Sequence, residues 1–251
     1  MATVLMPLPS HDFDPTESGL PWRVLESRGH RVVFATPDGR PAEADARMLT
    51  GEGLGPAKHA LMADANGREA YAAMSRSEAF AKPLRHERID PADYDGLLLP
   101  GGHAPRMREY LESHLLQGVI SAMFAADKPV AAVCHGVVLV ARSLGKDGLS
   151  VLHGRKTTAL LELQEMLAWN VTRLWRGDYY RTYPQSVQAE VTEALASPED
   201  FIAGPTPLLR DAPGKLERGF TVRDGNYLSA RWPGDVHRFA EEFADMLPAP
   251  R

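Results

Sequence analysis

Short apolar runs alternate with helical patterns in the first part of the chain. Thr3–Leu8 is an apolar run typical of a strand, and Arg31–Ala35 is a second one that is rich in β-branched and aromatic residues. Between them, Glu17–Arg28 carries apolar residues at helical spacing and stops at Gly29. A strand, a helix and a strand in this order predict a βαβ unit, and therefore a parallel sheet covered by helices.

The same alternation continues toward the C-terminus. Asp95–Pro100 and Val130–Val133 are apolar strand runs, and Asp224-Gly225 lies between two short strand runs that predict a hairpin. The pattern predicts further helices at residues 68–81, 106–112, 115–126, 135–144 and 236–247, and one that begins near Thr158. The length suits one α/β domain that spans residues 1–251.

Residues 170–215 interrupt this pattern. Trp175, Tyr179 and Tyr180 lie among arginines, and several prolines follow them. Such a stretch could stack on nucleic-acid bases, but the net charge of -5 disfavours that partner. We interpret the segment as an excursion that forms a lid, a pocket wall or a dimer contact.

The composition of the chain excludes several classes of protein. One cysteine excludes an intramolecular disulfide and fits a reducing compartment. The first residues do not resemble a signal peptide, and no apolar run approaches the length of a membrane span. The nine histidines show no zinc-binding spacing. We therefore expect a cytoplasmic protein with no metal, no cofactor and no nucleic-acid or membrane partner.

The most informative residue is that cysteine, Cys134, which lies where a strand run meets a helical run. Its simplest interpretation is a small buried hydrophobic residue. The abrupt change of pattern favours a nucleophile at a strand-to-helix turn instead, and Gly136 would let the new helix approach the sheet without a Cβ clash. The N-terminus of that helix would favour the thiolate.

Four local matches resemble the ThiJ/PfpI superfamily, and in particular its larger branch with glyoxalase III and heat-shock chaperone-like members. The matches are Ala131–Gly136, Asp93–His103, Phe34–Gly39, and Glu17 with Pro21 on the first predicted helix. The resemblance covers residues 1–169 and, loosely, 219–247. It implies a flavodoxin-like three-layer sandwich with a mostly parallel central sheet and a nucleophile elbow, to which residues 170–215 are an extra segment.

The resemblance also implies partners for the cysteine. Glu17, which could simply be a carboxylate that stabilises a helix start, corresponds to a family residue that faces the cysteine and moves protons. His135 would reach the thiol from the side and be oriented by Glu165, with Glu162 one helical turn earlier as the alternative. For both of these glutamates the plainer interpretation is a solvated helix charge.

Gly101-Gly102 follows a strand and could form a plain turn. The resemblance favours an oxyanion hole, in which the backbone amides of Gly102 and His135 bind the oxygen that becomes negative during attack. His103 would then lie near the substrate. Ala104 stands where the family usually has a glycine.

A glutamine amidotransferase of this fold is disfavoured, because Ala132 replaces the first glycine of its elbow and the chain has no His-x-Glu after the cysteine. We expect a cofactor-independent cysteine enzyme that acts on small carbonyl compounds and forms a homodimer. The resemblance suggests a glyoxalase III-like lyase that converts methylglyoxal to lactate, or a related hydrolase. The alternatives are a stress-related holdase chaperone, a cysteine redox sensor, or a member that has lost activity.

Overall fold

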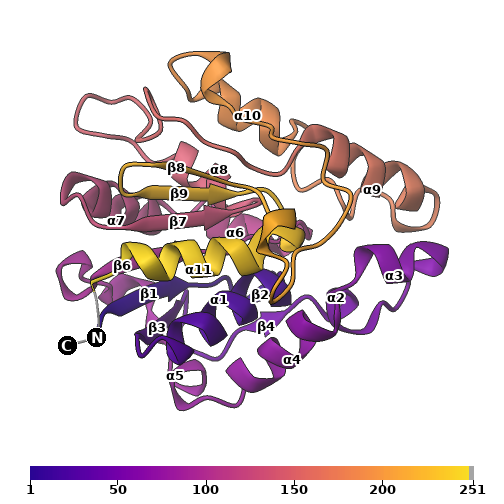
Figure 1. Ribbon diagram of the computed structural model, residues 1–251, viewed down its shortest axis with the longest axis horizontal. Helices are drawn as coiled ribbons and strands as arrows, with labels where there is room; N and C mark the ends of the chain where they lie inside the picture. The colour runs from indigo at the N-terminus through magenta and orange to yellow at the C-terminus, as the bar shows by residue number, and fades with distance from the viewer. Residues whose placement is uncertain (249–251) are drawn as a thin grey trace.

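A seven-stranded, mostly parallel sheet forms the centre of the protein in the computed structural model, which describes residues 1–248 (Figure 1). The strand order is β5-β3-β1-β6-β7-β9-β8, and β8 runs antiparallel to β9. Strands β6 and β7 are buried at every position, as expected for parallel strands that are covered on both faces. The bounds are β1 Thr3–Pro7, β3 Arg31–Thr36, β5 Leu84–Arg85, β6 Gly96–Leu99, β7 Val130–Val133, β8 Thr221–Asp224 and β9 Tyr227–Ala230; β2 (His11–Phe13) and β4 (Glu43–Ala44) form a separate pair.

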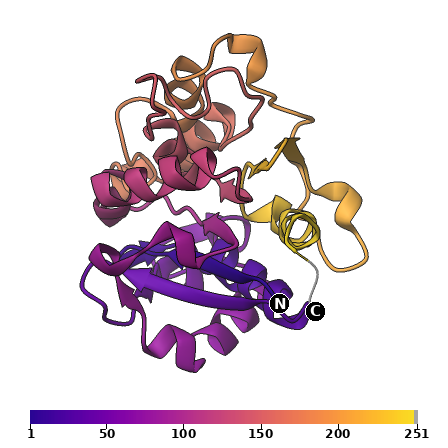
Figure 2. The same ribbon diagram turned by 90° about the vertical axis from the view of Figure 1, so that its left-hand side faces the viewer.

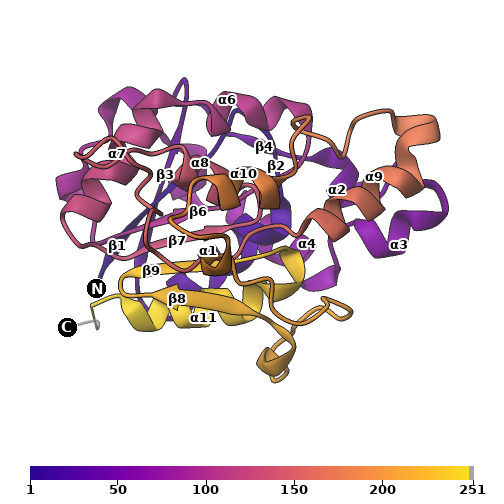
Figure 3. The same ribbon diagram turned by 90° about the horizontal axis from the view of Figure 1, so that it is seen from above.

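Helices cover both faces of this sheet (Figures 2 and 3). On one face α1 packs against α4 and α11, and on the other face α6, α7 and α8 pack together. This arrangement confirms the predicted flavodoxin-like three-layer sandwich. The helices are α1 Pro15–Ser27, α2 Ala46–Thr50, α3 Lys58–Leu61, α4 Ala65–Met74, α5 Glu78–Ala81, α6 Arg108–Leu111, α7 His114–Ala125, α8 Gly136–Ala141, α9 Glu162–Arg176, α10 Val187–Glu193 and α11 Val236–Met246.

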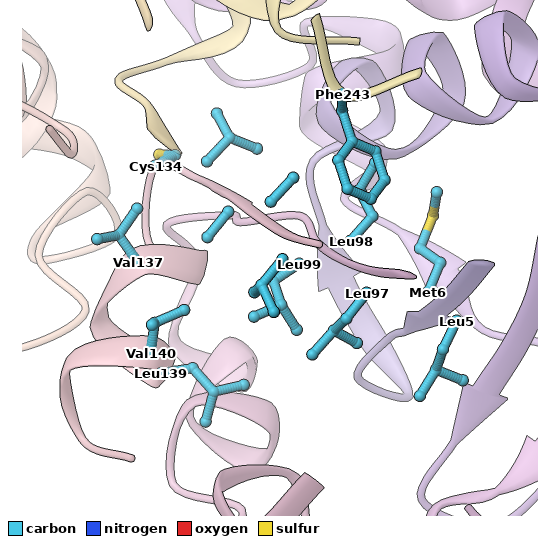
Figure 4. Packing of buried hydrophobic residues seen from close by; sticks show 14 of the residues in the cluster. Leu5, Met6, Leu97, Leu98, Leu99, Cys134, Val137, Leu139, Val140 and Phe243 are labelled. Carbon is cyan, nitrogen blue, oxygen red and sulfur yellow. The ribbon is translucent and has the colours of Figure 1, made fainter. Parts of the chain in front are cut away.

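The apolar core reaches up to the cysteine. Leu97 and Leu99 of β6, Val137 of α8 and Phe243 of α11 are fully buried, and Cys134, which directly follows β7, lies at one edge of this group (Figure 4). Burial of each large apolar side chain stabilises the folded state by about 1.5–3 kcal/mol relative to exposure to water. The candidate nucleophile is therefore held at the border of a close-packed core.

Several predicted helices have different bounds, and for three of them a specific hydrogen bond explains where the helix begins. Helix α1 begins at Pro15 because the Asp14 side chain accepts hydrogen bonds from the first free amides of the helix. The predicted helix 68–81 is two helices, because Ser77 caps a new start at Glu78. The helix expected from Thr158 begins at Glu162, since the Thr158 amide donates to Ser229 Oγ of β9 instead.

Residues 170–215 continue from α9 into a turn, α10 and a long loop. The end of α9 is tied to the turn before α3, because Trp175 Nε1 and Arg176 Nε both donate to the Gly53 carbonyl, at 3.1 and 2.5 Å. Helix α10 packs against α8. The segment thus covers one end of the sheet, where α9 and α3 lie in Figures 1 and 3. Within residues 1–248, no helix is long and apolar enough to cross a membrane.

Candidate active site

Cys134 occupies a strained turn between β7 and α8. Its φ is 57°, in the left-handed region that non-glycine residues rarely adopt, and its amide donates to the Ala230 carbonyl of β9 at 3.1 Å. Such a conformation costs about 1–3 kcal/mol and must be held by its surroundings. Gly136 contributes, because a Cβ there would collide with the Leu99 carbonyl oxygen of β6. The predicted nucleophile elbow is confirmed as a backbone geometry.

Glu17 approaches Cys134 from the first turn of α1. It is fully buried, and its Oε2 accepts a hydrogen bond from the Gly101 amide at 2.8 Å. Within the described residues its Oε1 has no hydrogen-bond partner. Burial, and then the neighbouring charge of Asp14, raise the pKa of Glu17 well above its usual value. The carboxyl therefore holds its proton to unusually high pH, and one of its oxygens is free for proton exchange.

The resting thiol differs from what the sequence predicted. Burial, followed by the charges of Glu17 and Asp14, raises the pKa of Cys134 well above its usual value. The amide of His135 at the helix start acts in the opposite direction, but it is a smaller effect. The helix terminus therefore favours the thiolate as expected, but burial and the two neighbouring carboxyl groups outweigh it. Glu17 and Cys134 cannot both ionise easily in a buried site, and they titrate as a pair.

His135 lies behind the cysteine and is fully buried. Its Nδ1 is 3.4 Å from Cys134 Sγ, and its Nε2 is 3.0 Å from Thr182 Oγ1. The Thr182 hydroxyl donates its proton to the His103 carbonyl at 2.6 Å, so it must accept from Nε2–H of His135. This series of hydrogen bonds leaves Nδ1 of His135 unprotonated and facing the Cys134 thiol. Burial lowers the pKa of His135 to about 3, so the ring is neutral.

Thr182, and neither predicted glutamate, orients His135. Glu165 lies on the first turn of α9, where its Oε2 accepts a hydrogen bond from the Val187 amide of α10 at 3.0 Å, and Glu162 is exposed. Both ring nitrogens of His135 already have partners, so the expected Glu165–His135 pair is corrected. Thr182 carried no signal in the sequence, because it lies in the segment that the family resemblance leaves unmatched.

Gly101 and Gly102 lie so close to neighbouring atoms that neither position has room for a side chain. A Cβ on Gly101 would lie 2.8 Å from both Glu17 Oε2 and the His135 amide. Gly102 has a φ of 151°, and a Cβ there would lie 2.8 Å from the Asp12 carbonyl. The amides of Gly102 and His135 donate to no backbone carbonyl among residues 1–248. The amide of His135 interacts with the Cys134 sulfur, and the amide of Gly102 has no protein acceptor among these residues.

His103 stacks on an aromatic ring from the 170–215 segment. The His103 and Tyr180 ring centroids are 4.2 Å apart with planes at 13°, and Tyr179 meets both rings edge-on. Tyr179 donates a hydrogen bond to Asp45. Burial lowers the pKa of His103, which keeps its ring neutral. His103 Nε2 and the Tyr180 hydroxyl have no partner among the described residues.

A cavity of about 740 Å³ brings most of the predicted residues together. Cys134, Glu17, Gly102, His103 and Glu165 all line it. The other three predicted residues do not reach the cavity wall and lie behind it: His135, Gly101 and Gly136.

Asp14, His59, Gln164 and Arg210 are polar residues of the cavity wall that were not predicted as site residues, whereas Tyr180 belongs to the segment interpreted as a lid or pocket wall. Asp14 could have been found from its place before Pro15, which is typical of a helix cap. Gln164 lies beside the predicted Glu165, but nothing in the sequence distinguishes its side chain. Arg210 lies in the segment 170–215, which the resemblance leaves unmatched. Within residues 1–248, no three His, Cys, Asp or Glu side chains cluster as potential metal ligands.

The fold and this elbow define an α/β protein with a cysteine at the nucleophile position. The chain belongs to the ThiJ/PfpI-like family, whose model matches residues 8–205.

Several known proteins resemble this chain over much of its length. Deglycase PfpI from Pyrococcus furiosus is 23% identical over 240 residues, which cover 96% of each chain. Deglycase TK1284 from Thermococcus kodakarensis is 27% identical over 164 residues, covering 65% of this chain and 69% of that protein. Glyoxalase III from Candida albicans has a crystal structure that matches with a TM-score of 0.72 and 18% identity, covering 99% of this chain and 98% of that one. This structural likeness supports the fold.

Proposed function

We propose that this protein is a cofactor-independent cysteine enzyme that acts on small carbonyl compounds, in the manner of a glyoxalase III-like lyase or a related hydrolase. The observation that carries the proposal is the strained Cys134 at the base of a cavity, next to a buried carboxyl with a free oxygen, Glu17 Oε1. Relatives named deglycase and a structural neighbour named glyoxalase III support the same class.

The first step is addition of the cysteine to an aldehyde. Sγ of Cys134 forms a bond to the aldehyde carbon, the thiol proton passes to a base, and the carbonyl electron pair moves to the oxygen. The amides of Gly102 and His135 hold that oxygen as it becomes negative. The base then returns the thiol proton to this oxygen, which gives a thiohemiacetal and restores the base.

The base for this step is Glu17 rather than His135. Burial raises the pKa of Glu17, whereas it lowers the pKa of His135 to about 3, so the Glu17 carboxylate is the stronger proton acceptor of the two. Because the raised pKa favours the protonated carboxyl, the reaction starts from the fraction of molecules in which Glu17 is ionised. The neutral ring, with Nδ1 directed at sulfur, positions the thiol and accepts its hydrogen bond.

With a 2-oxoaldehyde, the later steps also need only one carboxyl group. Glu17 takes the proton from the former aldehyde carbon and returns it to the neighbouring carbon, while the hydroxyl proton moves from the former aldehyde oxygen to the oxygen of the neighbouring carbon. These two transfers convert the thiohemiacetal into a thioester of the 2-hydroxy acid. Water then hydrolyses the thioester, releases the acid and restores the thiol. Methylglyoxal and water together give lactate, so no external oxidant or reductant is required.

The redox-sensor alternative is less well supported. A sensor cysteine is usually exposed and has a low pKa, because the thiolate is the form that reacts with peroxide. Cys134 is 5% exposed, and burial raises its pKa. A thiol that is protonated at rest and loses its proton to Glu17 when a substrate binds is better suited to catalysis than to sensing peroxide.

The test is lactate formation from methylglyoxal by the purified protein, followed by NMR. Cys134→Ser should lower kcat/KM by at least about a hundredfold, because the hydroxyl is a far weaker nucleophile at the same position. A Cys134→Ser protein with full activity would remove the nucleophile from the proposal. Suppression of client aggregation by both proteins, without turnover, would favour the chaperone alternative.

A further inference from the structure

The cavity above Cys134 is much larger than a three-carbon substrate needs. Its volume of about 740 Å³ lies in the range that holds a drug-sized ligand. The reacting groups Cys134 and Glu17 are buried, so they mark its inner end. The remaining volume extends between α3, α9 and the loop 207–210, whose residues form the rest of the wall.

The outer wall of this cavity is apolar. Leu167 and Val171 of α9 are 61% and 42% exposed, and Leu208 and Leu209 of the facing loop are 80% and 58% exposed. All four line the cavity, together with Met48 and Leu61 deeper inside. Four large apolar side chains in contact with water thus meet at one cavity mouth, and an apolar surface at such a place is typical of a ligand site. We call these four residues the apolar rim.

Arg210 supplies a positive charge to the cavity wall. It lies 5.3 Å from the Trp232 ring and donates to the Met62 carbonyl at 3.2 Å, while its Nη1 has no hydrogen-bond partner among the described residues. Its charge opposes the rise in the pKa of Asp14 and of Glu17. The four side chains of the apolar rim carry no charge and no hydrogen-bonding group, so the part of a substrate that covers them is apolar.

We propose that the preferred substrate is a 2-oxoaldehyde or related carbonyl compound with an apolar substituent, an alkyl chain or an aromatic ring, that lies against the apolar rim. This inference rests on the proposed function and names its substrate class. The carbonyl carbon reaches Cys134, while the substituent covers Leu167 and Leu208 and removes their surface from water. Binding energy from this contact is independent of the bonds that change at the carbonyl.

Phenylglyoxal and methylglyoxal test the proposal, since they share the reacting group and differ in the substituent. The kcat/KM of the wild-type protein should be at least about tenfold higher for phenylglyoxal, as expected when a hydrophobic contact is added. Leu167→Asp and Leu208→Asp should each lower the ratio of the two kcat/KM values by about tenfold.

Leu163 provides the matched control. It is 65% exposed and lies one turn before Leu167 on the same helix, but it does not line the cavity. Leu163→Asp should leave both kcat/KM values unchanged. Preference for methylglyoxal, or an equal loss in the Leu163 and Leu167 variants, would overturn the inference and leave the proposed function intact. So would a change of oligomeric mass in Leu167→Asp alone, which would make the apolar rim a contact between copies.

A second measurement does not depend on turnover. Cys134 is the single cysteine, so alkylation by iodoacetamide can be followed as one mass shift. Acetophenone, which keeps the aromatic ring but is not an aldehyde, should slow alkylation in the wild-type protein and in Leu163→Asp, and acetone at the same concentration should not. Loss of this protection in Leu167→Asp supports the inference, and equal effects of the two ketones contradict it. If no carbonyl compound is turned over but this protection is seen, the proposed function fails and the apolar site stands.

Discussion

The Thr182 hydroxyl accepts a hydrogen bond from Nε2 of His135 at 3.0 Å, and this contact selects the tautomer of a buried histidine beside the nucleophile. The two residues are 47 positions apart in the chain. Arg108 holds the same threonine in place by donating to its backbone carbonyl at 2.8 Å. The segment 170–215 therefore completes the proposed site from behind as well as covering it.

Replacement of Thr182 by valine should remove this selection. The Nε2–H would lose its acceptor, which costs about 1–3 kcal/mol of stability, and the ring could adopt the tautomer that points a proton at sulfur. We expect kcat to fall by about tenfold or more with a much smaller change in KM. Thr182→Ser keeps the hydroxyl and should restore kcat, which a purely structural role of the threonine methyl group would not predict.

Glu17→Gln should lower the activity of the protein and raise its stability. The amide can still accept from Gly101 through its oxygen, but it cannot move protons, so turnover of carbonyl compounds should fall by at least about a hundredfold. Because the native pKa of Glu17 is raised, its ionisation destabilises the folded state, and glutamine removes that cost.

The stability effect of Glu17→Gln can be measured by thermal unfolding. At pH 8 the variant should be more stable by about 1 kcal/mol or more, which corresponds to a Tm increase of about 2–4 °C. At pH 4, where the native carboxyl is protonated, the difference should vanish. A variant that is less stable at both pH values would show that the buried carboxyl is not under strain.

Glu165 should make stability depend on pH near neutrality. Burial raises its pKa from 4.5 to about 7 in the folded state, so the native protein holds a proton that the unfolded chain has already lost. Stability should therefore fall as the pH rises from about 4.5 to about 7. Asp211, whose pKa burial also raises to about 7, acts in the same direction.

Glu165→Gln tests the contribution of Glu165 to this slope. In urea unfolding, the variant should gain on the order of 2 kcal/mol relative to wild type at pH 8 and almost nothing at pH 4.5. A gain that is the same at both pH values would mean that packing, and not ionisation, explains the difference.

Gly136→Ala should destabilise the elbow. The added Cβ would collide with the Leu99 carbonyl oxygen and lie 2.9 Å from that of Pro100, which forces α8 away from the sheet. We expect a loss of about 2 kcal/mol or more and a loss of Cys134 reactivity. Gly118→Ala is the control, because this exposed glycine of α7 has open space around its Cβ position and alanine should stabilise the helix by about 0.5–1 kcal/mol. If Gly136→Ala keeps the stability and the Cys134 reactivity of the wild-type protein, the close approach of α8 to the Leu99 carbonyl is not needed to hold the turn at Cys134.

Elements that depend on neighbouring residues could be predicted from the amino-acid sequence. The strand runs, the turn at Cys134 and Gly136, and the position of Glu17 on the first helix are encoded in local pattern and motif, and they led to the correct fold. Helix bounds were less accurate where a cap such as Ser77, or a distant partner such as Ser229, decided the first turn.

Tertiary structure decided the environment of the site. Whether Glu165 or Thr182 meets His135 depends on how 170–215 packs on α8 and on Gly53, and no local pattern encodes that path. The protonation of Cys134 also depends on burial beside Glu17, and burial exists only once segments far apart in the chain have come together. The size and apolar rim of the cavity arise in the same way, from α3, α9 and a loop that meet only in the folded protein.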